Sequence, residues 1–423
     1  MMKNIFQPAE ILIPDFSRVD GTKWSVVACD QYTSDPAYWQ AVADFVGDAP
    51  STLRLMLPEV YLSESAARIP EIRKAMARAL SETLVAYPMA MIALERTHAD
   101  GRVRRGLVGA IDLEAYDYNK GSTSPVRATE GTVLERIPPR VAVRRGAQIE
   151  LPHVMLLIDD PDRTVIEPSF GHAVKPIYDF DLMQNGGHVR GSLLSEAEQA
   201  RVMGALAALV TPDAMQAKYG SSALAPLLFA VGDGNHSLAS AKAYYEEIKA
   251  AIGDAALTHP ARYALAEVVN VHDAALDFEP IYRVVFGADP ADLLSSFRAY
   301  VANLNGSAAA QSVTVLSGAK TEVIAVPNPE KQLAVGTLQT FLDAYLAAHP
   351  SVKVDYIHGE DAVRALVAAD PSNVGFLFDG MQKSDLFRTV IYDGALPRKT
   401  FSMGHAHDKR FYLECRSLFL KEK

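Results

Sequence analysis

Residues Ala225–Ile252 read APLLFAVGDGNHSLASAKAYYEEIKAAI, and this stretch decides the fold. The apolar run Leu227–Val231 predicts a buried strand that stops at a small polar turn, Gly232–Ser237. A helical pattern follows at once and ends before Gly253, with apolar residues at Leu238, Ala241, Tyr245 and Ile248. A buried strand that opens through a short turn directly into a helix indicates a protein of mixed α and β structure.

The turn is typical of an anion site. The first amides of a helix have no partner inside the helix, and together with the helix dipole they favour a negative charge. Gly232 and Gly234 let the backbone approach a ligand closely, and His236 can carry charge near neutral pH. An ordinary interpretation stays open, because Asp233, Asn235 and Ser237 are also common helix-capping residues.

Two familiar nucleotide motifs are excluded. The turn has Ser237 where the third glycine of a dinucleotide fingerprint would stand. The phosphate-binding P-loop motif GxxxxGK[ST] does not occur in the sequence. Lys320-Thr321 matches its last two positions, but Thr314 and Ala319 stand where the motif needs glycines.

The composition bounds the class of protein. The 423 residues are 49% hydrophobic and 22% charged, as in an ordinary globular protein, and the length favours two packed domains. The net charge of -10 argues against a sequence-independent nucleic-acid binder. Cys29 and Cys415 are the only cysteines, so neither a disulfide framework nor a cysteine zinc site is expected. No signal peptide or membrane span is recognised, and a cytoplasmic location is expected.

Strands and helices mix without strict alternation, which predicts an α+β fold with mixed sheets. Ser195 and Glu198 form a capping box for a helix through Leu209. We place a domain boundary near Asp273, giving domains 1–272 and 273–423. Residues 25–38 are predicted to form a short strand, a polar loop and then a helix whose first turn carries Pro36. The other predicted strands are 89–95, 103–113, 152–159, 266–271, 353–357, 374–378 and 386–392, and the other predicted helices are 293–303, 336–348 and 360–369.

The segment Lys120–Arg140 is the second group of interest. It reads KGSTSPVRATEGTVLERIPPR, lacks apolar periodicity and carries Lys120, Arg127, Arg136 and Arg140. Clustered cations suit phosphoryl transfer, whose transition state spreads negative charge over oxygens. Glu130 among them could orient an attacking hydroxyl, take its proton or hold Mg²⁺. A solvated loop with exposed ion pairs is the alternative.

Other residues give weaker signals. Asp30 and Tyr32 follow a predicted strand, where binding residues often lie. His405 and His407 could share a metal ion if they lay on a strand, although no third ligand is visible nearby. No Gly-x-Ser-x-Gly elbow occurs, and neither cysteine has a histidine nearby in the sequence, so serine or cysteine hydrolase chemistry has no support.

Three ordered motifs resemble the "domain of unknown function 1015" family. Residues 233–239, DGNHSLA, resemble its Asp-Gly-His-His-Arg-Tyr-x-x-Ala signature, with Asn235 and Ser237 in place of the commoner His and Arg. Residues 127–132, RATEGT, resemble its Arg-x-x-Glu-x-Thr segment, and residues 396–401, LPRKTF, resemble its C-terminal Leu-Pro-x-Lys-Ser-Thr-Phe stretch. Tyr282-Arg283 stands where His-Arg is usual.

The turn also resembles that of the ParB and sulfiredoxin superfamily, in which a Gly-x-His-Arg turn binds nucleotide phosphates. The resemblance implies a ParB/sulfiredoxin-like core in domain 1–272, with a smaller α+β domain 273–423 packed against it. It further implies relation to free serine kinases. The function it implies is transfer of phosphate from pyrophosphate or a nucleotide, with Mg²⁺, to the hydroxyl of free L-serine or a similar acceptor. A nucleotide-binding regulator without turnover and a phosphatase are the alternatives.

We therefore expect one pocket in which Lys120–Arg140 faces the turn. A small-molecule substrate is expected and no nucleic-acid or membrane partner, and a homodimer is allowed by the sequence but not required. No metal ligand is assigned. The expected catalytic residues are Glu130, His236 and Asp233; the expected phosphate-binding residues are Gly232, Gly234, Asn235, Ser237, Arg127, Arg136, Arg140 and Lys120; and the expected substrate-binding residues are Asp30, Tyr32 and Thr129.

Overall fold

The computed structural model describes residues 4–171 and 176–419. Contacts divide the described chain into two compact units. Unit 1 comprises the described residues of Met1–Ala128, Thr132–Leu276 and His405–Lys423, and unit 2 comprises Thr129–Gly131 and Asp277–Gly404. The predicted domains 1–272 and 273–423 stay a prediction; in this grouping the segment after Gly404 belongs to unit 1, because its strands pair with Val26–Val27 and Ile149–Glu150.

Unit 1 is built on a mixed sheet with the order β11-β12-β5-β6-β14-β10-β13-β8-β7, and β1 pairs with β6. The pairs β10–β14, β8–β13 and β7–β8 are parallel and the other pairs are antiparallel, so the predicted α+β class with mixed sheets is confirmed. The strands are β1 Phe6–Gln7, β5 Ile92–Thr97, β6 Val103–Asp112, β7 Tyr116–Asp117, β8 Val126–Ala128, β10 Met155–Ile158, β11 Tyr178–Asp181, β12 His188–Leu193, β13 Phe229–Asp233 and β14 Tyr263–Asn270.

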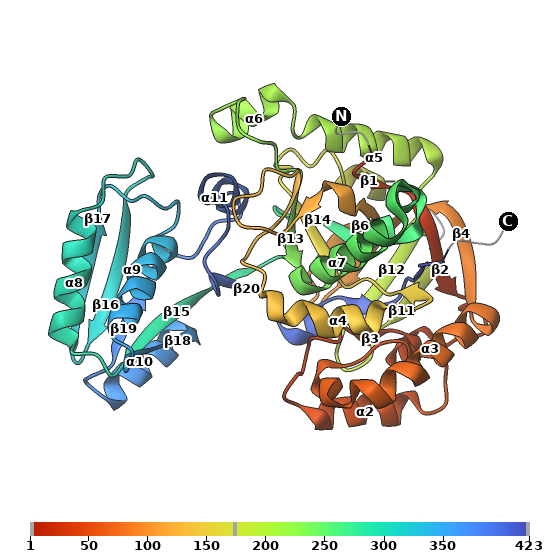
Figure 1. The fold of residues 1–423 in the computed structure, drawn as a ribbon, viewed down its shortest axis with the longest axis horizontal. Helices are drawn as coiled ribbons and strands as arrows, with labels where there is room; N and C mark the ends of the chain where they lie inside the picture. Colours follow the sequence, from red (N-terminus) through yellow and green to blue (C-terminus); the bar gives the residue numbers. More distant parts are fainter. Residues whose placement is uncertain (1–3, 172–175, 420–423) are drawn as a thin grey trace. The chain divides into compact units, whose positions relative to one another are not determined.

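Strands β10 and β13 bury apolar side chains in the middle of this sheet. Every side chain of β10 is buried, and Phe229, Ala230 and Val231 of β13 are inaccessible to solvent. Strands buried on both faces read as continuous hydrophobic runs, which is why this part of the sequence could be recognised. Helix α7 (Asn235–Ile252) leaves the end of β13 with only Gly234 between them. Helix α4 (Ile137–Arg144) packs beside α7, as Figure 1 shows, through Ile137 and Val141 against Ala239.

Small sheets and helices complete unit 1. Strand β2 (Ala9–Pro14) pairs with β4 (Leu84–Ala90), β3 (Val26–Val27) with β21 (Phe411–Tyr412), and β9 (Ile149–Glu150) with β22 (Arg416–Ser417). The remaining helices are α1 Gly21–Trp24, α2 Pro36–Val46, α3 Ser65–Glu82, α5 Glu196–Ala208 and α6 Pro212–Tyr219. The predicted capping box of α5 is present, with Ser195 and Glu198 bonded to each other's backbone amides.

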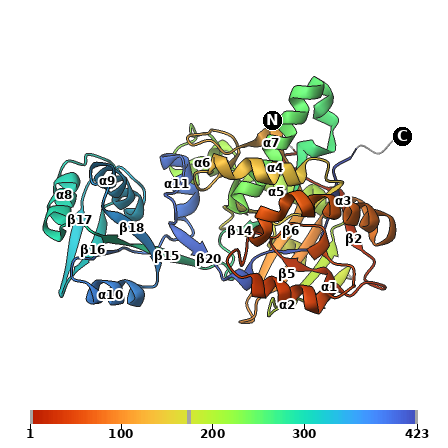
Figure 2. The ribbon, with the colours of Figure 1, turned by 60° about the horizontal axis from the view of Figure 1, so that its bottom comes forward.

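Unit 2 is a sheet covered on both faces. Its antiparallel strands have the order β17-β16-β19-β15-β18, and β20 extends β15. Residues Val284 and Val285 of β15 face opposite sides, towards α10 and towards α8 and α9, and Figure 2 shows these helices on the two faces. The elements are β15 Phe278–Phe286, α8 Pro290–Ala302, β16 Gln311–Ser317, β17 Lys320–Val326, α9 Ala334–Ala348, β18 Lys353–His358, α10 Glu360–Ala369, β19 Val374–Leu377, α11 Asp385–Asp393 and β20 Phe401–Met403.

Two predicted segments are wrong. Residues 386–392, read as a strand, form helix α11, because Leu386, Phe387 and Val390 are buried together on one helical face. The segment Lys120–Arg140, read as structureless, contains β8 and the start of α4; Pro138 and Pro139 sit in the first turn of that helix, where proline is tolerated. No helix of the described residues is long and apolar enough to cross a membrane.

Candidate functional site

The turn predicted from the sequence is present in unit 1. Gly234 has a left-handed conformation with φ 77°, and α7 begins at Asn235. A Cβ added to Gly234 would lie 3.1 Å from the Cα of Val154, so glycine is required both by the backbone angle and by the neighbouring chain. A Cβ at Gly232 would lie 2.7 Å from Leu157. The glycines therefore bring the start of α7 close against strand β10.

The N-terminal end of α7 has no side-chain cap. Among the described residues, backbone hydrogen bonding at this end of α7 starts with Leu238. Its amide donates to the carbonyl of Gly234 at 3.0 Å. The amides of Asn235, His236 and Ser237 precede it, and the Oδ1 atom of Asn235 is buried with no hydrogen-bond partner. Helix ends with unpaired donors of this kind bind anions.

Cationic groups of α4 and the preceding turn lie near His236. The imidazole is half-buried, and its Nε2 accepts a hydrogen bond from the amide of Val133 at 3.3 Å. Burial lowers the pKa of His236, and the nearby guanidiniums of Arg140 and Arg136 lower it further, outweighing the opposing effect of Asp30. The ring is therefore neutral near pH 7. Its Nε2 is an acceptor, which leaves the Nδ1–H as a donor.

A second histidine, which the sequence did not indicate, lies on the other side of the helix start. His153 is buried, and its Nε2 lies 2.9 Å from the Oγ of Ser237. Its Nδ1 lies 2.9 Å from the hydroxyl of Tyr412, and the carboxylate of Asp30 lies 3.7 Å from its Nε2. His153 stands 84 residues before Ser237 and in no recognisable motif, so only the fold brings the two together.

Asp30 and Asp233 both lie near Lys409. The ammonium of Lys409 is 3.3 Å from one carboxylate oxygen of Asp233, whose other oxygen accepts a hydrogen bond from the amide of Gly234 at 2.9 Å. Burial would raise the pKa of Asp30, but the neighbouring His153, a hydrogen bond from Gln31 and the charge of Lys409 hold it below its usual value. Both carboxylates therefore stand beside the turn, and Asp30 is ionised at neutral pH.

A pocket of ≈ 160 Å³ opens beside Ser237 and His153. Its wall is mainly apolar, and its charged groups are paired with one another: Arg140 with Glu59, and Arg144 with Glu150. The apolar residues that line it include Leu55, Met56, Leu57, Leu62, Met76, Val143, Ile149 and Leu151.

A family model described as "Protein of unknown function (DUF1015)" matches residues 14–345. The chain belongs to this family. No curated protein matches it.

Solved structures similar to this DUF1015 chain include a free serine kinase in complex with AMP, with 11% identity and a TM-score of 0.36 over 72% of this chain and 92% of that chain. A conserved hypothetical protein from Pyrococcus furiosus has 11% identity and a TM-score of 0.34, over 70% of this chain and 94% of that chain. C-terminally truncated SbnI from Staphylococcus aureus has 9% identity and a TM-score of 0.32, over 70% and 82%. TM-scores this low do not establish a shared fold, and a ParB/sulfiredoxin-like core stays a prediction.

The other predicted residues of this DUF1015 protein have different surroundings. Arg127 is buried on β8, where its guanidinium donates to the carbonyls of Ser124, Ala225 and Pro226 and so ties two loops together. Lys120 is exposed in a turn. Tyr32 has φ 51°, a sparsely populated angle for tyrosine, and its ring stacks on that of Tyr38 with centroids 3.6 Å apart.

Thr129 and Glu130 belong to unit 2. The carbonyl of Thr129 accepts a hydrogen bond from Leu396 at 2.7 Å, and Glu130 forms a parallel bridge with Leu396. Burial raises the pKa of Glu130, against the charges of Lys399 and Arg283 and a backbone hydrogen bond from Lys399. A raised carboxyl pKa suits a general base, but the predicted opposition of Glu130 and His236 stays a prediction.

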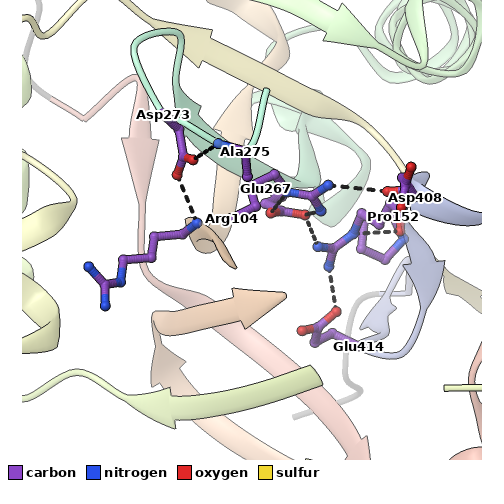
Figure 3. A network of polar contacts seen from close by, with 9 residues as sticks. Arg104, Pro152, Glu267, Asp273, Ala275, Asp408 and Glu414 are labelled. Atoms are coloured by element: carbon purple, nitrogen blue, oxygen red, sulfur yellow. Dashed lines mark hydrogen bonds and ion pairs between the residues drawn. The ribbon is translucent and has the colours of Figure 1, made fainter. Parts of the chain in front are cut away.

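A buried ionic network fixes the segment that carries Lys409 and Tyr412 (Figure 3). Glu267 is fully buried on β14 between the guanidiniums of Arg104 and Arg410, and Arg410 also binds Glu414. The Nε of Arg410 donates to the carbonyl of Pro152 at 3.1 Å, immediately before His153. The network thus fixes the backbone next to His153.

Proposed function

We propose that the N-terminal end of α7 binds the phosphate groups of a phosphoryl donor. The observation that carries the proposal is the uncapped helix start behind Gly234, with three amides pointing away from the helix and neutral His236 beside them. The guanidiniums of Arg136 and Arg140 both act on this histidine, and Arg136, which is not paired with Glu59 as Arg140 is, would offset the donor charge. The helix dipole, the amides at the start of α7 and the nearby guanidinium charge therefore all favour an anionic ligand such as a phosphate group.

From this site we infer a small-molecule phosphotransferase. It would move phosphate from pyrophosphate or a nucleotide to the hydroxyl of free L-serine or a similar acceptor, as expected from the sequence. Asp30 and Tyr32 would contact the acceptor, and Glu130 would orient its hydroxyl or take its proton. Arg136 takes the charge-neutralising role in this scheme, because the Arg127 guanidinium is already bonded to three carbonyls and Arg140 is paired with Glu59.

The described residues include no group of three or more His, Cys, Asp or Glu side chains that could hold a metal ion. Mg²⁺ commonly binds through one or two carboxylates together with the phosphates of the substrate. Asp30 and Asp233 could contribute such carboxylates, and we propose that any Mg²⁺ arrives with the donor. The ion would neutralise the charge of the transferred group.

A phosphorus NMR assay tests the function. Wild-type protein is incubated with MgCl₂ and either ATP or pyrophosphate, with and without a pool of hydroxyl amino acids. Acceptor-dependent consumption of one donor, with a new phosphomonoester signal, is the expected result. Tight donor binding without any new signal would instead favour a nucleotide-binding regulator, and release of inorganic phosphate without an acceptor would favour a phosphatase.

Variants locate the site. His236→Ala and Arg136→Gln should each weaken donor binding by about tenfold or more in calorimetric titration, because a hydrogen bond to a charged group contributes about 1.5–3 kcal/mol. Arg298→Gln is the matched control, since Arg298 is an exposed arginine of unit 2 with a single surface partner, Glu322. Unchanged donor affinity in both site variants would remove the N-terminal end of α7 from the mechanism.

A further inference from the structure

The pair Ser237 and His153 has the geometry of a nucleophile and its base. The Oγ of Ser237 and the Nε2 of His153 are 2.9 Å apart, within the distance at which imidazole can take a hydroxyl proton. Both side chains line the same pocket, so a ligand in it can reach them. A serine that merely capped the helix would bond to a backbone amide, but no side-chain cap exists at this helix end.

The surroundings of His153 favour the required tautomer. The hydroxyl oxygen of Tyr412 accepts the amide of Cys29 at 3.2 Å. The same oxygen lies 2.9 Å from the Nδ1 of His153, so it can accept the Nδ1–H of that ring. The Nε2 lone pair is then free to accept the proton of Ser237.

The imidazole is also held rigidly and prepared for positive charge. The carbonyl of Pro152 is bound by Arg410, and the carbonyl of Val154 accepts the amide of Glu267 at 3.0 Å, so the backbone is fixed on both sides of His153. Asp30, an ionised carboxylate 3.7 Å from Nε2, would stabilise the imidazolium once it forms. Nucleophile and base therefore occur together, and the hydroxyl of Tyr412, where a catalytic triad has a carboxylate, lies at the second ring nitrogen.

We propose that Ser237 is the first acceptor of the phosphoryl group, and that the protein works through a phosphoserine intermediate. This inference rests on the proposed phosphotransferase function. The Oγ–P bond forms as the bond from phosphorus to the departing phosphate or nucleoside diphosphate breaks, and the Oγ proton passes through His153 to that leaving group. In the second step the acceptor oxygen bonds to phosphorus, the P–Oγ bond breaks, and Ser237 regains a proton from the acceptor hydroxyl through His153.

The position of Ser237 suits both states of this cycle. A phosphoserine in the first turn of a helix is stabilised by the unpaired amides and by the helix dipole. The apolar pocket beside it has all its charges paired internally, so it would exclude water from the intermediate better than an open polar cleft. An acceptor with a small uncharged body fits this pocket better than one that brings an unpaired charge.

Labelling tests the inference. Wild-type protein is mixed with ³²P-labelled ATP or pyrophosphate without acceptor, quenched in acid, and digested for peptide mass spectrometry. We expect label on Ser237, a loss of that label when acceptor is added, and isotope exchange between donor and leaving group in the absence of acceptor. The exchange assay needs no variant, so it decides the question even if a substituted protein does not fold.

Three variants complete the test. Ser237→Ala should abolish labelling and exchange, and His153→Asn should slow labelling by about 10²–10⁴-fold, the usual contribution of a general base. Ser240→Ala is the matched control, because Ser240 stands one turn further along α7 and donates its hydroxyl to the carbonyl of His236 at 2.6 Å; it should label as wild type does. Donor turnover with no labelled Ser237 and an active Ser237→Ala protein would overturn the intermediate and leave the proposed function standing. No donor consumption under any condition would overturn both.

Discussion

Replacing Gly234 by alanine tests the geometry on which the site depends. Gly234 has φ 77°, where a residue with a Cβ costs about 1–2 kcal/mol. The new Cβ would also lie 3.1 Å from the Cα of Val154 and 3.3 Å from the ring of His153. Backbone on one side cannot yield as a flexible side chain does, and such overpacking costs about a further 1–3 kcal/mol. We expect Gly234→Ala to destabilise unit 1 by about 2–5 kcal/mol.

The chain supplies a matched control in Gly220, which ends α6. Its φ is 80°, but an added Cβ would meet no atom within 4 Å. Gly220→Ala should therefore cost only the conformational part, about 1–2 kcal/mol. The loss of unfolded-state entropy on replacing glycine by alanine is common to both variants and cancels in the comparison.

Urea unfolding followed by tryptophan fluorescence measures the difference. The chain has two tryptophans, and Trp24 and Trp39 are both buried in unit 1, so the signal reports this unit. With a urea dependence of about 1–3 kcal/mol per molar, the midpoint of Gly234→Ala should lie below that of Gly220→Ala by about 1 M. Equal midpoints would refute the claim that β10 and the start of α7 are in close contact through Gly234.

Three further outcomes are expected. Glu267→Gln should lower the free energy of unfolding by about 3–5 kcal/mol in urea, because it leaves the buried guanidinium of Arg104 without its charge partner and removes one of the two carboxylates bound by Arg410. Glu322→Gln at an exposed pair should change it by less than about 1 kcal/mol. The ring nitrogens of His188 each lie 2.7 Å from a carboxylate, of Asp179 or of Asp181, and these carboxylates raise the pKa of His188 in spite of burial. The stability that His188 adds is therefore complete below its unfolded pKa and is lost as the pH rises through its higher folded pKa. An NMR titration that gives a normal or lowered pKa for His188 would contradict this. Glu130→Gln should lower the rate of phosphoryl transfer by about 10²–10⁴-fold with donor affinity unchanged in calorimetry, and full turnover would exclude Glu130 as the residue that orients or deprotonates the acceptor hydroxyl.

Local signals in the sequence were sufficient for the strand, turn and helix around Gly234. There the buried run, the polar turn and the 3.6-residue period agree, and the helix ends at Ile252, before the predicted stop at Gly253. Helix α10 likewise spans the predicted residues, Glu360–Ala369. In α11 the β-branched and aromatic residues favoured a strand, yet the segment is helical, with Leu386, Phe387 and Val390 buried on one face. Tertiary packing decides such short segments.

The chemistry of the site could be predicted only in part. The residues of the turn are consecutive, so their proximity follows from the chain. His153, Asp30 and Tyr412 come from three distant segments, and the pairing of β3 with β21 that brings two of these segments together has no signature in either strand of two residues. For Arg127 the sequence suggested a phosphate-binding role, but its guanidinium donates to backbone carbonyls. The side chain is buried, and a buried guanidinium needs hydrogen-bond acceptors for its N–H groups.

The return of residues 405–419 to unit 1 bears on how the protein is made. On the ribosome, Glu267 is synthesised well before Arg410 and Glu414, and Val27 almost four hundred residues before its pairing partner Phe411. The nascent chain of unit 1 therefore carries a buried carboxylate without one of its guanidinium partners, and a histidine without its tyrosine, until all of unit 2 has been translated. Domains generally fold as units during synthesis, but this one is complete only when its last segment emerges. The contacts of His153 with Tyr412 thus form late in the synthesis of each molecule, and a released fragment ending at residue 404 should contain a folded unit 2 and an unfinished unit 1.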